Sequence, residues 1–181
     1  DVIAVNDAPN APTIELNGEE DQVLVIDPAF ILSNASDLDG DTLTLESLEV
    51  RNPPNATLQP QADGMYHLVA PADFNGLIEL AYEVSDGTDT VEGSISVDVI
   101  PVNDAPFKDG NASLTTHEDG AFTFNADDML GLFGDIDSDN LVISRVIMPE
   151  GEDGGELQDN GDGTWTFTPT DNFAGTSGMQ V

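Results

Sequence analysis

Apolar and polar residues alternate along most of this chain, and clusters of Gly, Pro, Asn and Asp interrupt the alternation about every 8–12 residues. A period of two places successive side chains on opposite faces of a strand. The clearest case is 77–84, where Ile78, Leu80, Tyr82 and Val84 share one face. Before residue 101 the pattern predicts seven strands, at 13–16, 23–26, 42–50, 56–58, 65–70, 77–84 and 90–100.

Two segments depart from this alternation. Phe30, Ile31 and Leu32 are consecutive apolar residues and predict an apolar plug or a single helical turn. Within 42–50 the apolar positions change from odd to even numbers at Ser47, which predicts a β-bulge. Short strands at this turn spacing favour an all-β fold of the Ig-like β-sandwich type, with a barrel as the alternative.

A five-residue segment occurs twice and divides the chain. The sequence Val-Asn-Asp-Ala-Pro at 5–9 returns 97 positions later at 102–106. This period is long enough for a domain with its own core and too long for a solenoid unit of about 20–50 residues. We therefore expect the end of a preceding repeat at 1–5, one repeat at 6–102 and a second at 103–181.

The second repeat follows the first but is C-terminally incomplete. Its acidic loop at 135–139 matches the loop at 37–41, and Val181 then aligns with Tyr82. The end of the sixth strand and the whole seventh strand have no counterpart. The prediction is two tandem Ig-like seven-stranded β-sandwich domains, the second lacking its last strand or strands, in a fragment of a longer protein.

The charge balance is strongly acidic, with 36 Asp and Glu against three Lys and Arg and a formal net charge of −33. Such a chain cannot neutralise phosphates, which argues against nucleic acid and against anionic membrane surfaces as partners. No apolar run predicts membrane insertion, and no signal peptide is evident. Cysteine is absent, so disulfides cannot stabilise the fold. Self-repulsion of this size favours a bound cation, and a solvated surface of the halophile type is the alternative.

Two acidic loops have the spacing of calcium ligands. Asp37, Asp39 and Asp41 present carboxylates at every second position, and calcium prefers oxygen ligands of this kind. The matching residues of the second repeat are Asp135, Asp137 and Asp139. Neither loop is an EF-hand, because the twelfth position holds Leu48 in one and Val146 in the other instead of Glu. The remaining ligands must therefore come from other segments.

If successive strands reverse direction, the loops at each end of a sandwich collect acidic residues from separate segments. At the end where the linker enters, the first repeat gathers Asn6, Asp7, Asp37, Asp39, Asp41 and Asp86. At the opposite end it gathers Glu20, Asp21 and Asp73, near the linker residues Asn103 and Asp104 and the second repeat's Asp135, Asp137 and Asp139. Glu118 and Asp119 are the second repeat's counterparts of Glu20 and Asp21. Without Lys or Arg these clusters would repel strongly, which predicts calcium between repeats rather than a solvated rim.

Five short motifs together resemble the cadherin-like tandem repeats of large bacterial RTX-type surface adhesins. They are the Val-Asn-Asp-Ala-Pro linkers, Glu-Asp after the first strand, Asp-x-Asp-Gly-Asp at 37–41, Ser-Asp-Gly at 85–87 and Asn-Phe-x-Gly at 172–175. The resemblance implies secretion by a Gram-negative bacterium through type I export, a place at the cell surface, calcium-rigidified modules and a role in cell adhesion or biofilm formation. It also implies neighbouring repeats as partners, and host, algal or bacterial surface ligands bound by other domains. Two departures stand in the second repeat: Ser138 replaces the Gly40 of the first, and an aspartate matching Asp86 is missing.

The residues give little support to an enzyme. His67 lies within a predicted strand and His117 lies in a turn beside Glu118, so neither has the surroundings of a catalytic base. Carboxylate pairs could serve a glycosidase, but here they lie on loops at the ends of a sandwich. Trp165 alternates with threonines and is predicted to be a strand residue. We therefore expect a non-catalytic extender module, and the alternative is a split scaffold domain carrying an inserted sugar- or peptide-binding domain.

Overall fold

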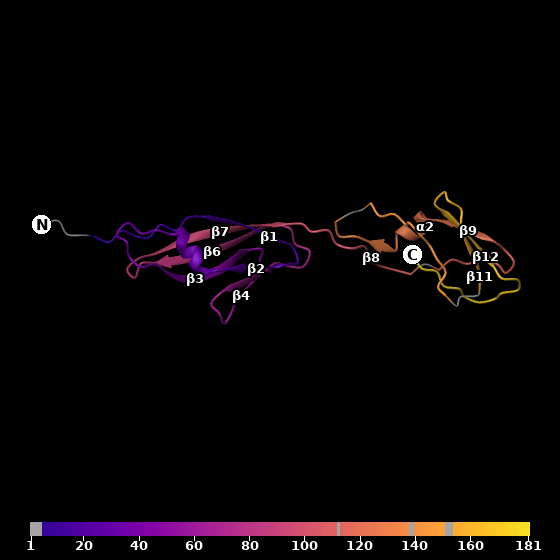
Figure 1. The fold of residues 1–181 in the computed structure, drawn as a ribbon, viewed down its shortest axis with the longest axis horizontal. Helices are drawn as coiled ribbons and strands as arrows, with labels where there is room; N and C mark the ends of the chain where they lie inside the picture. Colours follow the sequence, from indigo (N-terminus) through magenta and orange to yellow (C-terminus); the bar gives the residue numbers. More distant parts are fainter. Residues whose placement is uncertain (1–4, 112, 138–139, 151–153) are drawn as a thin grey trace. The chain divides into compact units, whose positions relative to one another are not determined.

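The computed structural model describes residues 5–111, 113–137, 140–150 and 154–181. The chain forms two compact units, Asp1–Val102 (unit 1) and Asn103–Val181 (unit 2), which are labelled by element in Figure 1. Asp139 of the second acidic triplet, Ser138 beside it and the first four residues lie outside the described residues.

Unit 1 consists of two β-sheets and one short helix. One sheet has the strand order β1-β7-β6-β3 and the other has the order β2-β5-β4. The elements are β1 (Ile14–Glu19), β2 (Val23–Ile26), α1 (Pro28–Asn34), β3 (Thr44–Asn52), β4 (Thr57–Pro60), β5 (Tyr66–Val69), β6 (Gly76–Ser85) and β7 (Thr90–Ile100). The predicted all-β sandwich of seven strands is confirmed in this unit.

The core of unit 1 lies between the inner faces of the two sheets. Alternate residues of β6 and β7 are buried there, as the period of two predicts, and Tyr82 and Val97 are fully buried. They pack against Ile26 and Leu68 from the opposite sheet and against Ile31 from α1. Seven of the thirteen buried residues of this core belong to the central pair β6–β7.

Strand direction brings separate loops to the same end of unit 1. β6 and β7 are antiparallel, and β7 pairs in parallel with β1, so β1 and β7 run the same way. Loop 35–43 before β3 and the turn 86–89 between β6 and β7 therefore lie beside the chain that enters at residues 5–9. The turn between β1 and β2 and the loop before β6 lie at the other end.

Several local predictions for unit 1 are confirmed, and some strand limits differ. β2 and β7 have the predicted limits, and the register between β3 and β6 shifts at Ser47 as the bulge predicted. The apolar plug is α1, where Asp27 caps the helix by accepting the N–H of Ala29 at 2.8 Å. β1 extends to Glu19, three residues beyond the prediction, because its parallel ladder with β7 continues to the pair Glu19–Ile100.

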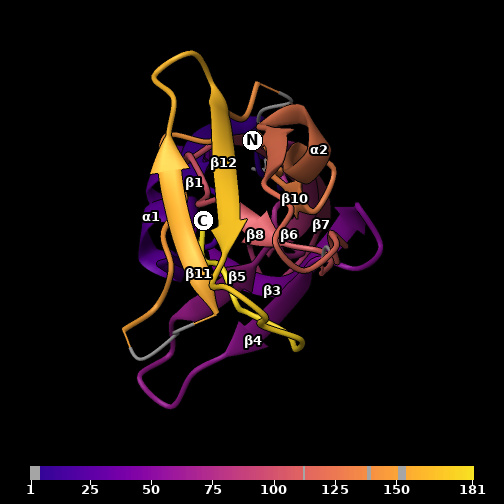
Figure 2. The same ribbon diagram turned by 90° about the vertical axis from the view of Figure 1, so that its right-hand side faces the viewer.

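Unit 2 contains one well-formed sheet, and Figure 2 shows two of its strands, β11 and β12, as broad arrows side by side. This sheet has the order β11-β12-β9, and a second, two-stranded sheet pairs β10 with β8. The elements are β8 (Phe107–Lys108), β9 (Phe122–Asn125), α2 (Asp127–Leu130), β10 (Phe133–Gly134), β11 (Gly155–Asp159) and β12 (Thr164–Pro169). The buried core consists of Phe124, Met129, Val146, Trp165 and Phe167.

The sheet of unit 2 corresponds to β2-β5-β4 of unit 1, whereas the other sheet is not formed in the described residues. In the described residues, the counterparts of β1, β3 and β6 contain no strand. What remains is one isolated bridge between Ile147 and Gln180. The physical reason is pairing: in unit 1, β7 supplies the ladder for both β1 and β6, and unit 2 has no counterpart of β7 among the described residues.

Candidate metal centre

Three segments of unit 1 meet where the chain enters. The N–H of Asp7 donates to the Asp39 carboxylate at 2.7 Å. The side-chain amide of Asn6 donates to Asp86 Oδ2 at 3.0 Å and to Asp89 Oδ2 at 2.9 Å. We call this group the entry cluster, and it consists of Asn6, Asp7, Asp37, Asp39, Asp41, Asp86 and Asp89.

The acidic loop before β3 is folded around Asp37. Asp37 Oδ1 accepts the N–H groups of Asp39 and Gly40 at 2.9 Å and of Asp41 at 3.2 Å. Gly40 has φ +83°, a left-handed conformation that favours glycine. One carboxylate oxygen from each of Asp37, Asp39 and Asp41 lies within 4.8 Å of the others. The second oxygen of Asp37 is buried and has no hydrogen-bond partner in the described structure.

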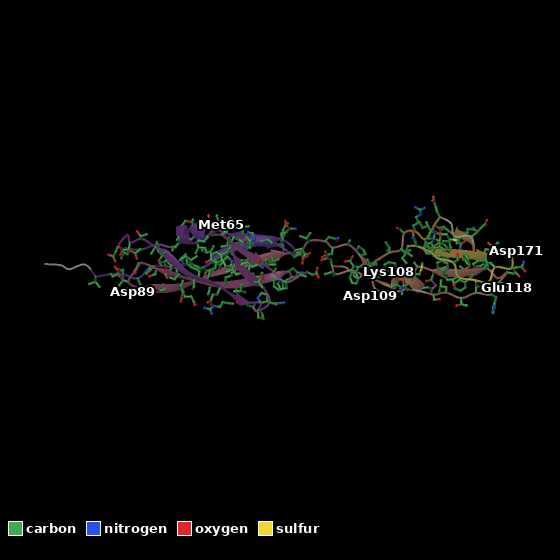
Figure 3. The ribbon with its side chains drawn as sticks, turned by 90° about the horizontal axis from the view of Figure 1, so that it is seen from below. Met65, Asp89, Lys108, Asp109, Glu118 and Asp171 are labelled. Atoms are coloured by element: carbon green, nitrogen blue, oxygen red, sulfur yellow. The ribbon has the colours of Figure 1, made fainter. Side chains whose placement is uncertain are left out.

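The turn between β6 and β7 contributes two further carboxylates. Asp86 Oδ1 accepts the N–H groups of Thr88 and Asp89, both at 2.7 Å. The bond from the Asp89 N–H, then the Asn6 amide and the Thr88 N–H, hold the pKa of Asp86 below its usual range. The lowered pKa favours the ionised form of the Asp86 carboxyl. Asp89 follows the turn and is labelled in Figure 3.

At the other end of unit 1, Glu20 is only 1% exposed. Its Oε1 accepts the N–H of Val102 at 2.6 Å, while its Oε2 is buried without a hydrogen-bond partner in the described structure. A buried carboxylate oxygen with no donor is costly unless a cation compensates it. Nearby in the sequence, Asp21 Oδ1 accepts the N–H of Asp73 at 3.2 Å, and both residues have positive φ. Glu20, Asp21 and Asp73 form the exit cluster of unit 1.

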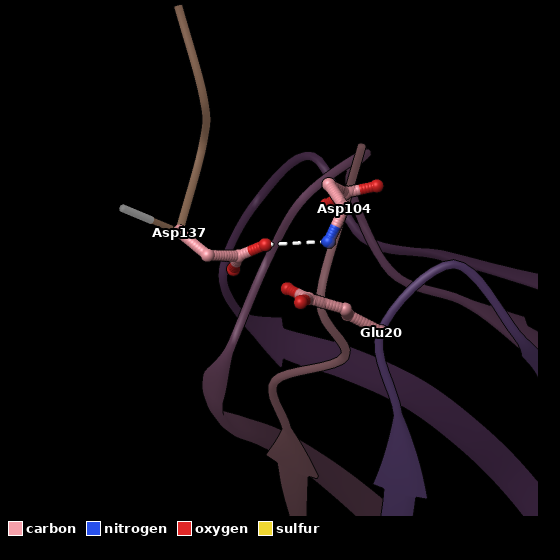
Figure 4. Close-up of side chains that lie close together, drawn as sticks. All are labelled: Glu20, Asp104 and Asp137. Carbon is pink, nitrogen blue, oxygen red and sulfur yellow. Dashed lines mark hydrogen bonds between the residues drawn. The ribbon is translucent and has the colours of Figure 1, made fainter. Parts of the chain in front are cut away.

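Unit 2 repeats the hydrogen bonds of the entry cluster. The N–H of Asp104 donates to Asp137 Oδ2 at 2.6 Å (Figure 4), as the N–H of Asp7 does to Asp39. The N–H of Asp137 donates to Asp135 Oδ1 at 3.0 Å, as the N–H of Asp39 does to Asp37. The linker and the acidic loop therefore fold together in both units.

The far end of unit 2 repeats the exit cluster only in part. The N–H of Asn172 donates to Asp119 Oδ1 at 3.1 Å, which matches the bond between Asp73 and Asp21. Glu118, labelled in Figure 3, is exposed, unlike its counterpart Glu20. The contrast has a structural cause, because Glu20 is held by Val102 after β7 and unit 2 has no such strand among its described residues.

The donor set of these clusters suits a hard cation. Every side-chain atom that could bind a metal in these clusters is a carboxylate or amide oxygen, and no His or Cys takes part. The ion pairs of the described structure both involve Arg51, with Glu49 and Glu92 on the outside of unit 1, so no basic side chain neutralises the clusters. The unpartnered oxygens of Asp37 and Glu20 fit a metal of the calcium type, which takes about 6–8 oxygen ligands.

The structure brings most of the predicted site residues together and adds one residue that was not predicted. The structure joins the predicted Asn6, Asp7, Asp37, Asp39, Asp41 and Asp86 at the entry end of unit 1, and joins Asp21 to Asp73 at the exit end. Asp89 was not predicted, although its position three residues after Asp86 in a Gly-containing turn was a usable signal. His67 and His117 belong to none of these clusters.

Comparison with protein families gives the family. The model for the cadherin-like domain matches residues 5–100 and again 102–181. The chain belongs to the cadherin-like domain family. Each match covers one unit, so each unit of this cadherin-like protein is one cadherin-like domain. No curated protein matches the chain. None of the helices in the described residues is long and apolar enough to cross a membrane.

The solved structures that match this chain include human protocadherin-24 and an endo-fucoidan hydrolase among others. Domains EC1-2 of human protocadherin-24 are 19% identical with a TM-score of 0.48, and the match covers 96% of this chain and 82% of that one. An endo-fucoidan hydrolase of glycoside hydrolase family 107 is 19% identical with a TM-score of 0.36, with 90% of this chain covered. The cadherin-like chain spans about a quarter (24%) of the length of that hydrolase.

Proposed function

We propose that this cadherin-like chain is a non-catalytic extender segment of a bacterial cell-surface adhesin, rigidified by calcium at the ends of its units. The single observation that carries the proposal is the repeated bond from the linker to the acidic loop, Asp7 to Asp39 and Asp104 to Asp137. A linker that folds onto a ligand loop in each repeat ties metal occupancy to the geometry of the joint. The adhesion and biofilm role, export by a Gram-negative cell and an extracellular location belong to the same proposal.

Covalent connectivity supports a calcium site shared by successive units. Glu20 accepts the N–H of Val102, and Asp137 accepts the N–H of Asp104. Val102 and Asp104 are two positions apart, so their Cα atoms cannot be more than about 7 Å apart. Ligands fastened to these two amides are therefore tethered within reach of one cation. The proposed ligands at this joint are Glu20, Asp21, Asp73, Asn103, Asp104, Asp135, Asp137 and Asp139.

The expected affinity is that of extracellular calcium modules, with Kd on the order of 10⁻⁴ M or somewhat tighter for so acidic a site. A cation that binds only the folded state stabilises it by mass action, which gives about 2 kcal/mol for each site at about 2 mM calcium. For a unit of this size that corresponds to a rise in Tm of about 10 °C.

The test is thermal unfolding and calorimetric titration in calcium and in chelator. We expect unit 1 to melt about 10 °C higher in about 2 mM calcium. Asp37→Asn should remove most of this increase, because it weakens the ligand around which the loop folds. Asp98→Asn removes one charge from an exposed position of β7 and is the matched control. Identical melting curves with and without calcium would overturn the calcium proposal.

A further inference from the structure

The first and last strands of unit 1 lie side by side and run in the same direction. β1 and β7 pair in parallel over six residue pairs, from Ile14–Ile95 to Glu19–Ile100. β1 is the edge strand of its sheet, so β7 is the one strand that pairs with it in the described structure. The β1–β7 ladder is therefore the direct backbone connection between the strand that follows the entering linker and the strand that precedes the leaving linker.

Further hydrogen bonds extend this ladder beyond both of its ends. At the entry end, the hydroxyl groups of Thr13 and Ser94 share a hydrogen bond of 2.8 Å. At the exit end, the N–H of Glu20 donates to the carbonyl of Ile100 at 3.1 Å. The Glu20 carboxylate then accepts the N–H of Val102 at 2.6 Å. The connection between the two segments thus begins before β1 and continues past the last residue of β7.

The core of unit 1 covers the inner side of the ladder. Ile14 of β1 is 5% exposed, and Ile95 and Val97 of β7 are 1% and 0% exposed. Glu20, at the end of the ladder, is only 1% exposed. Water therefore has little access to these hydrogen bonds from the inner side. A bond that breaks there leaves its donor and acceptor without a replacement partner, which is costly.

Parallel pairing determines how the ladder is loaded when the chain is stretched. The linker enters beside the start of β1, and the chain leaves unit 1 after the end of β7, at the opposite end of the ladder. Tension on the two linkers therefore pulls β1 and β7 along their axes in opposite directions. The hydrogen bonds of a parallel ladder are evenly spaced and cross from strand to strand, so all six pairs are loaded together. Pulling both strands apart from one end would instead break the pairs one after another.

We propose that the β1–β7 ladder is the load-bearing element of unit 1, and that Glu20 closes it at the exit end. Sliding β7 past β1 must separate the Val102 N–H from the Glu20 carboxylate in the same step, which adds the cost of two unpartnered groups to the barrier. The proposal rests on the extender function for the source of the tension, whereas the resistance itself follows from the strand pairing.

The role of Glu20 in the ladder is separate from its proposed role as a calcium ligand. Its Oε1 atom holds the Val102 N–H, and its Oε2 atom is the one without a hydrogen-bond partner in the described structure. The ladder is therefore closed without a cation, and a cation at Oε2 would leave the bond to Val102 in place. Measurements in chelator isolate the ladder from the calcium site.

The experiment is single-molecule stretching of the whole chain between two introduced cysteines, which are unique because the chain has none. One variant carries Ala8→Cys and Ala105→Cys, so that the ladder is loaded lengthwise. The other carries Gln22→Cys and Ala105→Cys, so that both strands are pulled from their exit ends. All three positions are exposed. At the same loading rate in chelator, we expect the force that unfolds unit 1 to be at least about twofold higher in the lengthwise variant.

Two substitutions of Glu20, each made in the lengthwise variant, separate its hydrogen bond from its charge. Glu20→Gln keeps an oxygen acceptor for the Val102 N–H and should keep the unfolding force in chelator. Glu20→Ala removes the acceptor and should lower the force by about one fifth or more.

Leu68→Ala is the control for a general loss of stability. Leu68 is 2% exposed in β5 of the opposite sheet, outside the ladder. Its truncation should lower the midpoint of chemical denaturation at least as much as Glu20→Ala does, because it leaves a cavity in the core. The lengthwise unfolding force should change by less than about one tenth, since the packing of β5 is still intact when the ladder breaks.

Equal unfolding forces in the two pulling directions would overturn the load-bearing ladder. An unchanged force in Glu20→Ala, or an equal loss of force in Leu68→Ala, would overturn the role of Glu20. Repeating the comparison in calcium tests the proposed function separately. A force that depends on direction but not on calcium supports the ladder and contradicts the calcium site.

Discussion

Tyr82 lies directly against Gly93, its partner in the neighbouring strand of unit 1. A Cβ atom added at Gly93 would stand 2.4 Å from the Tyr82 ring, so the ring occupies the place of a side chain. The Tyr82 hydroxyl donates to the carbonyl of Pro12 at 2.5 Å, which fastens the chain before β1. Burial of Tyr82 also raises the pKa of its hydroxyl, which remains a donor. This pair connects the centre of the β-sandwich to the segment that follows the linker.

Gly93→Ala should destabilise unit 1 by about 1–3 kcal/mol, because the added methyl group must displace a buried aromatic ring. Chemical denaturation of the variant measures the change in the free energy of unfolding. Ser96→Ala, on the same strand, is the control and should change that free energy by less than about 0.5 kcal/mol. A variant at Gly93 as stable as the parent would show that the ring moves without cost.

Asp162 in the β11–β12 turn should titrate below the usual range of aspartate. The Thr164 hydroxyl donates to it at 2.6 Å and the Thr164 N–H at 3.1 Å, and these bonds lower its pKa. A lowered pKa means that the contribution to stability is present above the ordinary value of about 3.9 and is lost as the pH falls through the folded value. NMR titration of the carboxyl carbon measures this pKa.

Thr164→Val removes the hydroxyl and keeps the side-chain shape, so the pKa of Asp162 should rise toward the ordinary value. Thr168→Val, farther along β12, is the matched control and should leave it unchanged. If the Asp162 pKa in the Thr164 variant equals that in the parent, the side-chain hydrogen bond is not the cause of the shift.

Much of unit 1 could be predicted because its signals are local. β7 has the predicted limits, since Val91, Ile95, Val97 and Val99 occupy alternate positions along the strand, interrupted only at Gly93. α1 begins where Asp27 and Pro28 provide a cap and a first helical residue. The end of β1 was not predictable in this way, because the ladder at Gly18 and Glu19 depends on β7, about eighty residues later.

In the candidate site, too, residues close together in the sequence could be predicted, and residues that are brought together from distant segments could not. The Asp37, Asp39 and Asp41 triplet could be found from its spacing, since one turn brings all three together. Asp89 joins the site through Asn6, which is 83 positions away in the chain.

Hydrogen exchange should show unequal protection in the two units. β6 and β7 lie in the interior of a four-stranded sheet, so their amide groups should exchange at close to the rate of global unfolding. Residues 113–116 and 141–146, the counterparts of β1 and β3, form no strand and should exchange faster by at least a hundredfold. β1 and β3 of unit 1 provide the internal control. Equal protection of their amide groups and of the amide groups of 113–116 and 141–146 would contradict the absence of a second sheet from the described residues of unit 2.

The last prediction concerns the joint at Val102–Asp104. We expect calcium to narrow the distribution of interdomain distances, measured by double electron–electron resonance between spin labels on introduced cysteines in exposed positions of β3 and β11. Asp137→Ala should broaden it again, because the carboxylate that holds the Asp104 N–H is removed. Asp127→Ala also removes one exposed charge of unit 2, but from α2, and should behave as the parent does. If the Asp137 variant keeps the narrow distribution in calcium, Asp137 does not bridge the two units; if calcium has no effect on the parent, the joint is not a calcium site.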